Sequence, residues 1–528
     1  MLDVNKLSIT INKNGRKLID DLSFSLNAGD KIAVIGEEGN GKSTLIKAIV
    51  DTNLVKYATI EGKINKHGHT IGYLSQFIPE GWDSATVASY FLKDDPNDEE
   101  DYERYNDFDR LYKLASLLNF DTNALENEMK IGNLSGGEKI KIQLLKILMN
   151  NPDILILDEP TNDLDIRSLQ WLENFISKST KPILYISHDE MLLENTANAI
   201  LHIEQLKKKR VPQATFKRLG YKEYVQDRNA TLQKDEQIAL KERAEDRERM
   251  EKWRQVYNRV DYELNTISRQ DPAGARLLKK KMKAVKSQEK RFEKQREGFR
   301  DIPDPEEAIN IKLGEDVNAS SRKIFDVDIK SLEVGGKKLS QNLHLSMVGS
   351  RKYVIIGDNG VGKTTFLKRL YTELDNQHNI NVAYMPQNYD DYLNRFESVL
   401  SFVSSFCHTK EDITKARTYL GSMKFTTDET EGKISELSGG QKAKLYLLKL
   451  ILSDANLLLL DEPTRNLSPL SNPVIRNVFK NYKGAIVAIS HDRKFILEVA
   501  DEIFQLTPEG FKAVDKELIN QEAAVHEI

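Results

Sequence analysis

The chain contains one cysteine, Cys407, among its 528 residues, so no disulfide can form within it. A lone thiol is typical of proteins kept in a reducing compartment, and we expect a cytoplasmic protein. The first residues include no basic stretch that leads into an apolar run, so we expect no signal peptide. Nor does any window approach the roughly 20 unbroken apolar residues that a membrane helix needs. These absences exclude a membrane-embedded transporter as the role of this chain by itself.

Charge is unevenly spread along the chain. Residues 207–300 contain 28 Lys and Arg against 15 Asp and Glu, a balance of +13, whereas the whole chain carries −4, which leaves −17 for the rest. Such asymmetry indicates a basic arm for a polyanion on otherwise acidic domains. A solvated charged helix without a partner would give the same balance, and charge alone does not separate the two interpretations.

Two halves of the chain carry the same motifs in the same order. Residues 36–43 and 357–364 both match the phosphate-binding P-loop pattern, and each follows an apolar run and opens a helical pattern. This context of strand, glycine-rich turn and helix distinguishes a phosphate site from a chance match. The predicted nucleotide-binding residues here are Gly36, Glu37, Glu38, Gly39, Asn40, Gly41, Lys42, Ser43 and Thr44 in the first half, and Gly357, Asp358, Asn359, Gly360, Val361, Gly362, Lys363, Thr364 and Thr365 in the second.

Four further motifs follow each P-loop: a glutamine, a Leu-Ser-Gly-Gly signature, an Asp-Glu pair after an apolar run, and a histidine after a second apolar run. The signature serine precedes the aspartate by 23 positions in both halves, and the aspartate precedes the histidine by 30 positions in both. The residues are Gln76, Ser135, Gly136, Gly137, Glu138, Asp158, Glu159 and His188, and then Gln387, Ser438, Gly439, Gly440, Gln441, Asp461, Glu462 and His491. Matched spacing over this length predicts one α/β fold used twice, in domains at residues 1–206 and 321–528.

These residue types suit the chemistry of a bound triphosphate. Backbone N–H groups of each loop and the positive end of the following helix can hold the phosphates, and Lys42 and Lys363 should reach the outer two. The predicted Mg²⁺ ligands, direct or through water, are Ser43, Gln76, Asp158, Thr364, Gln387 and Asp461. The predicted catalytic residues, which orient or deprotonate water or contact the γ-phosphate, are Glu159, Glu462, His188 and His491.

Each signature lies too far along the chain from its own P-loop to complete that site. Head-to-tail pairing solves this, because the signature of one half then closes the pocket of the other. One predicted pocket combines Lys42, Ser43, Gln76, Asp158, Glu159 and His188 with Ser438 and Gly440. The other combines Lys363, Thr364, Gln387, Asp461, Glu462 and His491 with Ser135 and Gly137. We expect the nucleotide to hold the halves together and its hydrolysis to release them.

The segment between the halves is rich in charged residues and nearly free of Gly and Pro, except at residues 270–274. This pattern predicts two long helices around a short break, the first of about 45 residues and on the order of 65 Å, the second about 40 Å. We expect an antiparallel hairpin within residues 207–320, with its tip near residues 266–276. Its returning arm is strongly basic, which suits contact with an RNA backbone. A spacer that only joins the two halves is the alternative.

Tandem cassettes without membrane spans, joined by a charged helical linker, resemble the ABC-F family of ATPases over nearly the whole chain. The resemblance implies two ABC-type nucleotide-binding domains in tandem, two ATP molecules per chain with Mg²⁺, and a monomer whose own cassettes pair. It also implies binding at the E site of the bacterial 70S ribosome and no membrane partner. The linker would reach toward P-site tRNA and the 23S rRNA of the peptidyl-transferase centre.

Two segments, at residues 267–291 and 461–471, look like the antibiotic-resistance branch of that family. The first half keeps Asn-Asp-Leu-Asp at residues 162–165, whereas the second carries Arg-Asn-Leu-Ser at residues 465–468. Ser468 thus stands where the first half has Asp165, and the loss of this carboxylate predicts two unequal sites. The leading hypothesis is a ribosome-protection factor that displaces a drug and leaves the ribosome on hydrolysis.

Other functions stay open at this stage. A housekeeping translation factor would bind the ribosome without affecting drugs. A transporter motor fused as a dimer does not need the basic hairpin, and a DNA-repair ATPase would lack the expected zinc-binding cysteines. No clear aromatic side chain stands where adenine would stack in either half, so ATP rather than GTP is implied by the resemblance alone.

Overall fold

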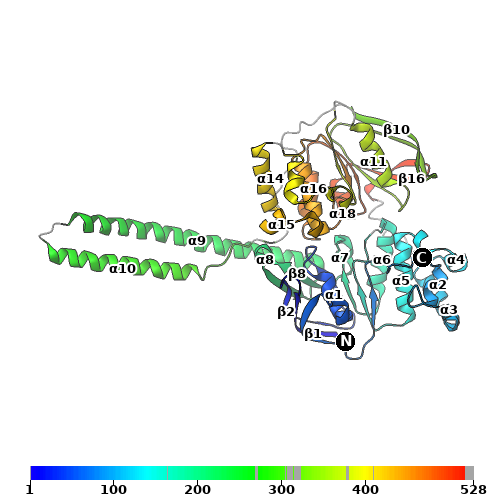
Figure 1. Ribbon diagram of the computed structural model, residues 1–528, viewed down its shortest axis with the longest axis horizontal. Helices are drawn as coiled ribbons and strands as arrows, with labels where there is room; N and C mark the ends of the chain where they lie inside the picture. The colour runs from blue at the N-terminus through cyan, green and yellow to red at the C-terminus, as the bar shows by residue number, and fades with distance from the viewer. Residues whose placement is uncertain are drawn as a thin grey trace. The chain divides into compact units, whose positions relative to one another are not determined.

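The computed structural model describes residues 2–162, 164–267, 271–303, 305, 313, 323–375, 380–407 and 409–517. It divides into two compact units, which are Met1–Tyr221 with Glu306–Ile528 and, separately, Lys222–Pro305. We call the first the cassette unit, with cassette 1 before residue 222 and cassette 2 after residue 305, and the second the hairpin unit (Figure 1). No helix of the described chain is both long and apolar enough to cross a bilayer. The predicted domain limit at residues 320–321 lies outside the described residues, so the domain limits remain a prediction.

Cassette 1 alternates strands and helices along the chain. Its strands are β1 (Leu2–Ile11), β2 (Lys17–Leu26), β3 (Lys31–Ile35), β4 (Ala58–Asn65), β5 (Ile71–Leu74), β6 (Ile154–Leu157), β7 (Ile183–Ile186), β8 (Ala199–Gln205) and β9 (Val211–Lys217). Its helices are α1 (Lys42–Val50), α2 (Val87–Leu92), α3 (Phe108–Leu117), α4 (Asn123–Glu126), α5 (Gly136–Met149), α6 (Ile166–Lys178), α7 (Glu190–Thr196) and α8 (Leu206–Lys209).

Cassette 2 repeats this order with small differences. Its strands are β10 (Lys323–Val334), β11 (Lys337–Val348), β12 (Lys352–Ile356), β13 (Val382–Met385), β14 (Leu457–Asp461), β15 (Ala485–Ile489), β16 (Glu502–Thr507) and β17 (Gly510–Val514). Its helices are α11 (Lys363–Leu374), α12 (Asp390–Leu393), α13 (Val399–Ser404), α14 (Lys410–Ser422), α15 (Thr427–Glu431), α16 (Gly439–Ile451), α17 (Asn472–Lys480) and α18 (Arg493–Val499).

Each cassette is built on a six-stranded sheet with the same permuted order. The order is β5-β6-β7-β3-β8-β9 in cassette 1 and β13-β14-β15-β12-β16-β17 in cassette 2. The first five strands of each sheet are parallel and the last pairs antiparallel. Strands β3, β6 and β7 are buried along their whole length, as expected for continuous apolar strands in a parallel sheet. A smaller antiparallel sheet accompanies each, in the order β2-β1-β4 and as the pair β10-β11.

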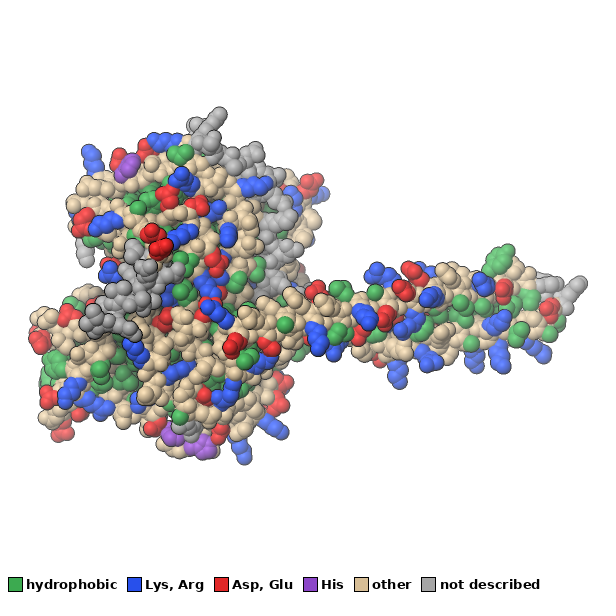
Figure 2. All heavy atoms as spheres, turned by 180° about the vertical axis from the view of Figure 1, so that it is seen from behind, with side chains coloured by type: hydrophobic (Ala, Val, Ile, Leu, Met, Phe, Trp, Pro, Cys, Tyr) green, Lys and Arg blue, Asp and Glu red, His purple; other side chains and the backbone are tan. Residues whose placement is uncertain are grey.

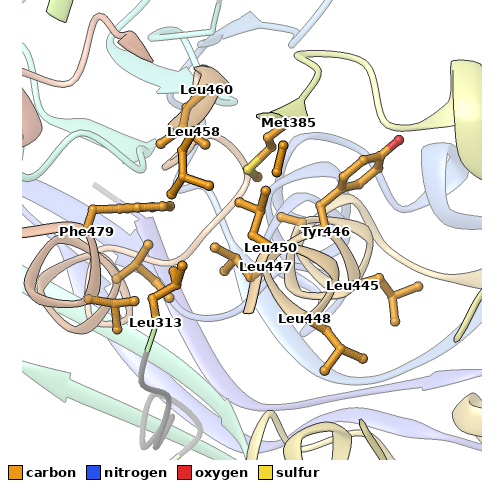
Figure 3. Packing of buried hydrophobic residues seen from close by; sticks show 14 of the residues in the cluster. Leu313, Met385, Leu445, Tyr446, Leu447, Leu448, Leu450, Leu458, Leu460 and Phe479 are labelled. Carbon is orange, nitrogen blue, oxygen red and sulfur yellow. The ribbon is translucent and has the colours of Figure 1, made fainter. Parts of the chain in front are cut away.

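The core of cassette 2 forms where its sheet meets the helices that follow the signature motif. Figure 3 shows Leu458 and Leu460 of β14 with side chains of α16, such as Leu447 and Leu450, and with Phe479 of α17. None of these five side chains is more than 2% exposed. Removing one leucine here should cost about 2–5 kcal/mol, since a close-packed core collapses only partly around a cavity. The core therefore fixes the signature helix α16 relative to the strand that carries Asp461.

The hairpin unit consists of α9 (Tyr221–Thr266, 46 residues), of which all but Tyr221 belongs to it, and α10 (Pro272–Arg296, 25 residues). The Trp253 indole donates to the carbonyl of Val285 at 2.9 Å, and Arg296 pairs with Asp246 at 2.7 Å. Partner numbers fall on one helix as they rise on the other, so the helices are antiparallel. The predicted hairpin is confirmed, and its predicted tip includes residues 268–270, which lie outside the described residues.

Local sequence explains where α10 begins and which face it buries. Asp271 caps its first turn by accepting from the N–H of Gly274 at 2.8 Å, and Pro272 stands in that turn, where no N–H is needed. Leu278, Met282 and Val285 are its buried residues, at a spacing that puts them on one face. Most of its exposed residues are charged, and Figure 2 shows Lys and Arg side chains along the length of the unit.

Candidate nucleotide-binding sites

The predicted site residues of each cassette follow four neighbouring parallel strands. In cassette 1 the P-loop follows β3, Gln76 follows β5, Asp158 follows β6 and His188 follows β7. Carboxyl ends of parallel strands meet at one edge of a sheet, which is where open α/β sheets bind ligands. Cassette 2 repeats the arrangement with β12, β13, β14 and β15. The topology thus collects residues that are far apart in sequence.

Both P-loops depend on glycine at their first position. Gly36 has φ 143°, and a Cβ there would lie 2.2 Å from the carbonyl oxygen of Ile203 on β8. Gly357 has φ 147°, and a Cβ there would lie 2.6 Å from the carbonyl oxygen of Leu506 on β16. Because these clashes are with backbone, any side chain would displace the loop from the sheet. Glycine therefore lets the loop pack closely enough to present its N–H groups.

The P-loop lysines lie across their own loops. The Lys42 ammonium donates to the carbonyls of Gly36 and Glu37 at 2.9 and 3.1 Å, and Lys363 repeats this with Gly357 and Asp358 at 2.7 and 3.0 Å. Both side chains are buried. A charge held inside a loop of N–H groups adds to an anion site. Burial lowers the pKa of Lys363, with the nearby Glu462 carboxylate opposing the shift.

The aspartates that end the central strands suit a divalent cation. The Ser43 hydroxyl donates to Asp158 at 2.9 Å and Tyr73 donates to it at 3.3 Å. Asp461 is 1% exposed, and neither of its carboxylate oxygens has a hydrogen-bond partner of ordinary geometry within the described residues. Burial raises the pKa of Asp158, and it raises that of Asp461 to about 6. Carboxylate and hydroxyl oxygens are the ligands that Mg²⁺ prefers, and it is commonly held by one or two carboxylates plus substrate phosphates, so these residues fit the ion.

The two glutamates share an unusual backbone conformation. Glu159 has φ 51° and Glu462 has φ 53°, in the left-handed region that non-glycine residues seldom adopt. Such strain persists only where the surroundings determine it, and it is concentrated at functional sites. Its occurrence at both copies of one position indicates a shared requirement for where the carboxylate points.

Three side chains converge on the Glu159 carboxylate. Gln76 and Asn162 donate to it at 2.9 and 2.8 Å, and the Nε2 atom of His188 lies 3.5 Å from it. Burial alone would raise the pKa of Glu159, but the His188 ring, Lys42 and Asn162 outweigh it and hold the pKa at about 2. The predicted residues Gln76, Glu159 and His188 therefore form one cluster.

Glu462 occupies a different environment. The backbone N–H of His491 donates to it at 3.2 Å, and the His491 Nε2 atom lies 3.7 Å away. Burial and the neighbouring charge of Asp461 raise the pKa of Glu462, and burial lowers that of His491 to about 3. The two sites thus differ in the surroundings of equivalent residues.

A cavity of about 940 Å³ joins the P-loop of cassette 2 to the signature of cassette 1. The predicted residues that line it are Asn359, Gly360, Gly362, Lys363, Thr364, Thr365, Gln387, Asp461, Glu462 and His491 from cassette 2, with Ser135, Gly136, Glu138 and His188 from cassette 1. His188, which the sequence assigned to the other pocket, therefore also borders this one. Gly137 packs against Ser168 instead. The volume is in the range of ligand pockets. The structure brings together most of the set proposed for this second site.

No Phe, Tyr or Trp side chain lines the described part of this cavity. Val334 of β10 and Leu339 of β11 supply its aliphatic wall on the side of the small sheet. A nucleotide base there would contact branched aliphatic groups instead of a ring on which to stack.

At the first site, the P-loop of cassette 1 touches the signature of cassette 2 directly. The Glu38 carboxylate accepts from the N–H of Gly439 at 3.0 Å and from the N–H of Gly440. These groups open the 13-residue helix α16, whose positive end attracts anions. Glu37 contacts Lys444, Ser468 and Ser471 of cassette 2. His188 of cassette 1 also contacts cassette 2, since its Nδ1 atom lies 2.6 Å from the carbonyl oxygen of Leu467.

These acidic contacts were not predicted from the sequence, although Glu37 and Glu38 were assigned to the loop. A set of ion pairs in which cassette 2 supplies the cations and cassette 1 the anions was not predicted either. Arg476 pairs with Glu190 on α7, and Lys494 pairs with Glu190 and Glu194. Arg493 pairs with Glu173 at 2.8 Å and with Asp189 at 3.2 Å. The available signal was the contrast between Asp189-Glu190 and Asp492-Arg493 after the two histidines.

Comparison with known proteins places these sites in context. The family described as ABC transporter matches residues 19–162 and 340–465. An uncharacterized ABC transporter ATP-binding protein of Bacillus subtilis, YfmM, is 30% identical over 533 residues, which are 92% of this chain and 95% of YfmM. ATP-binding protein Uup of Buchnera aphidicola is 26% identical, and the alignment covers 96% of this chain and 81% of Uup. ABC transporter F family member 5 of Arabidopsis thaliana is 27% identical, and the alignment covers 93% of this chain and 73% of that protein.

Solved structures show the same fold at lower identity. The archaeal ribosome recycling factor aABCE1, in complex with the ribosomal stalk protein aP1, superposes with a TM-score of 0.58 and 17% identity, and covers 98% of this chain and 92% of its own. At this identity the likeness shows the fold alone.

Proposed function

The chain belongs to the ABC transporter family of ATP-binding proteins, in which it falls into an ABC-F-like group with tandem cassettes, and it is an ATPase. From this premise we propose that it is a ribosome-protection factor. In this proposal the chain binds the E site of the antibiotic-stalled 70S ribosome with two ATP molecules held between its cassettes. The hairpin tip reaches toward P-site tRNA and the peptidyl-transferase centre and displaces the drug. Hydrolysis releases the protein.

One observation carries this proposal, which is a basic helical hairpin joined to a pair of ATP-binding cassettes. Helix α10 contains ten Lys and Arg against two Glu, and most of these cations are exposed. Exposed cations on a long helix suit contact with nucleic-acid phosphates, which is electrostatic and weakened by salt. A hairpin of two helices is stiff enough to carry a displacement at its base to its tip, because packed side chains transmit strain.

The residues of each site take the following roles. N–H groups of the P-loop and the lysines Lys42 and Lys363 bind the phosphates, and the signature of the opposite cassette completes the γ-phosphate contact. Ser43 and Asp158 in one site, and Thr364 and Asp461 in the other, would hold Mg²⁺, which would supply positive charge against the phosphates.

The catalytic residues complete each site. The left-handed turn at each glutamate directs its carboxylate to the attacking water, which it orients or deprotonates. His188 and His491 contact the γ-phosphate.

Two further lines of support concern the ribosome and resistance. Relatives of this chain include an ABC transporter F family member, and a protein of the same fold, aABCE1, is named a ribosome recycling factor. The resistance role rests on the similarity of residues 267–291 and 461–471 to the resistance branch of the ABC-F family.

Ribosome binding is tested with a variant that holds ATP. In Glu159→Gln/Glu462→Gln, hydrolysis should become very slow while ATP still binds, so the protein should sediment with 70S ribosomes on a sucrose gradient when ATP is present. The matched control replaces the lysine run at residues 279–281 with glutamine in the same background, and it should sediment less. If the double variant leaves ribosomes as readily as the parent chain, the assignment of the two glutamates is wrong.

Resistance is tested separately in a drug-sensitive bacterium that expresses the parent chain. Inhibitory concentrations are measured for lincosamide, pleuromutilin, streptogramin A, phenicol and oxazolidinone drugs. A rise for at least one class is expected, with Lys42→Ala/Lys363→Ala as the inactive control. Ribosome binding without a rise for any class would refute protection and would favour a housekeeping translation factor.

A further inference from the structure

Glu37, the second residue of the first P-loop, is buried against cassette 2. Its side chain is 11% exposed, and its carboxylate lies 3.1 Å from the Lys444 ammonium. The Ser468 hydroxyl donates to it at 2.9 Å, and the Ser471 hydroxyl also donates to it. Burial alone would raise the pKa of Glu37, but Lys444 and the hydroxyls outweigh it and hold the pKa at about 2. This carboxylate is therefore ionised and paired inside the contact between the cassettes.

The partner Ser468 stands at the position where cassette 1 has a carboxylate. Asp165 accepts from the N–H of Ser168 at 2.9 Å and so caps α6. Ser468 accepts from the N–H of Ser471 at 3.2 Å in the same relative position. The local turn is thus kept in cassette 2 by a hydroxyl, and the charge that this position has lost is supplied from the opposite P-loop by Glu37.

The arrangement occurs on one side only. Asp358, which corresponds to Glu37 in the second P-loop, is less buried than Glu37. Lys141 corresponds to Lys444, and it donates to the carbonyl of Asn119 in its own cassette at 2.8 Å. A carboxylate at Ser468 would meet Glu37 in a buried site, where like charges repel strongly. Serine at residue 468 and glutamate at residue 37 are therefore compatible with each other, because only one of the two positions carries a carboxylate.

We propose that Glu37 is a positioning residue of the first ATP site, where its carboxylate replaces the missing one at Ser468 and holds the signature helix of cassette 2 against the first P-loop. This inference rests on the composite sites of the proposed function. Opening the first site breaks the pair between Glu37 and Lys444 together with the hydrogen bonds from Ser468 and Ser471. The equivalent lysine at the second site, Lys141, is bound within its own cassette. The first site consequently releases nucleotide more slowly than the second.

The test measures release of radiolabelled ATP from Glu159→Gln/Glu462→Gln after a chase with unlabelled ATP. The slow phase is assigned to the first site by its loss in Lys42→Ala. Adding Glu37→Gln should speed this phase about tenfold or more, because truncating one partner of a buried charge pair acts mainly on dissociation. Ser468→Asp should also speed it. Combining the two changes moves the carboxylate back to residue 468 and should restore slow release, a rescue that loss of packing would not produce.

Controls separate this inference from the function on which it rests. Glu61→Gln, an exposed carboxylate on β4, should leave the slow phase unchanged. If circular dichroism shows that Glu37→Gln is misfolded, release is compared between Ser468→Asp and Ser468→Ala. Only Ser468→Asp, which adds a charge, should speed release strongly. Slow release that persists in Glu37→Gln, or no rescue in the combined variant, would overturn the role of Glu37. No retained ATP in the starting variant would instead refute the composite sites.

Discussion

Replacing Arg476 with methionine should loosen the contact between the cassettes at helices α7 and α17. The Arg476 guanidinium forms two parallel hydrogen bonds to Glu190, one of them at 3.2 Å, and a third to Glu498 at 3.0 Å. The paired side chains are 3% and 4% exposed. Burial raises the pKa of Glu190 despite the opposing charge of Arg476, so the glutamate is poorly solvated and depends on its partner.

The expected cost follows from what each change leaves behind. Breaking a buried ion pair typically costs about 3–5 kcal/mol, because one charge stays buried without compensation. In Arg476→Met, Lys494 still lies 3.3 Å from Glu190, so we expect the lower limit of about 3 kcal/mol. In Glu190→Gln, Arg476 keeps Glu498, and about 2 kcal/mol is expected. The double variant removes both charges and should cost about 2 kcal/mol less than the sum of the two single changes.

Hydrogen–deuterium exchange of peptides from α7 and α17 is the appropriate assay, since a chain of this size does not unfold in two states. A loss of about 3 kcal/mol in local opening free energy corresponds to exchange about 100-fold faster. The control is Arg104→Met, because Arg104 makes the same two-bond contact with Asp94 but at the surface, where the pair is worth about 1 kcal/mol or less. Unchanged exchange in Arg476→Met, or strictly additive single costs, would refute this reasoning.

Three further predictions concern the nucleotide and the hairpin. Glu38→Asn removes the carboxylate that competes with phosphate at the N-terminus of α16, so ATP affinity at the first site should rise several-fold. Titration calorimetry measures this affinity, and no rise would contradict the competition. Because Val334 offers no ring to the base, GTP should be hydrolysed at a rate within about tenfold of ATP, and Val334→Tyr should lower the KM for ATP about tenfold by stacking. Replacing the lysines at residues 279–281 with glutamine should reduce the salt dependence of ribosome binding by about one unit of slope for each phosphate that the hairpin no longer binds, and an unchanged slope would mean that other residues bind the phosphates.

Sequence alone predicted the features that depend on local pattern. The P-loops need glycine where Gly36 and Gly357 approach a neighbouring strand, and that need is visible as a motif. The hairpin was predicted from two long stretches without Gly or Pro, and the cap at Asp271 with Pro272 marks the start of its second helix. The repeated spacing of 23 and 30 residues required one fold used twice, and the two sheets have the same strand order.

Contacts between the cassettes could not be predicted in the same way, because their partners are hundreds of residues apart. Glu37 and Ser468 are separated by 431 positions, and Arg476 and Glu190 by 286. From the sequence, serine at residue 468 indicates only the loss of a charge, because nothing in the sequence pairs that position with the P-loop of the other half. The left-handed turn at Glu159 was also missed, since glutamate carries no preference for it.

Two of the ion pairs between the cassettes follow a rule that only the fold reveals. At the constant offset of 303 residues between the halves, Glu173 corresponds to Arg476 and Glu190 to Arg493. The pairs formed are Arg476 with Glu190 and Arg493 with Glu173, which are equivalent to each other when the cassettes are exchanged. Cassette 1 therefore supplies the glutamate in both pairs and cassette 2 the arginine in both. Two copies of cassette 1 would oppose Glu173 with Glu190, and two copies of cassette 2 would oppose two arginines. Like charges are strongly unfavourable at such buried or partly buried positions. Duplicated halves that could pair with their own kind are thus directed to pair with each other, which is what the proposed composite sites require.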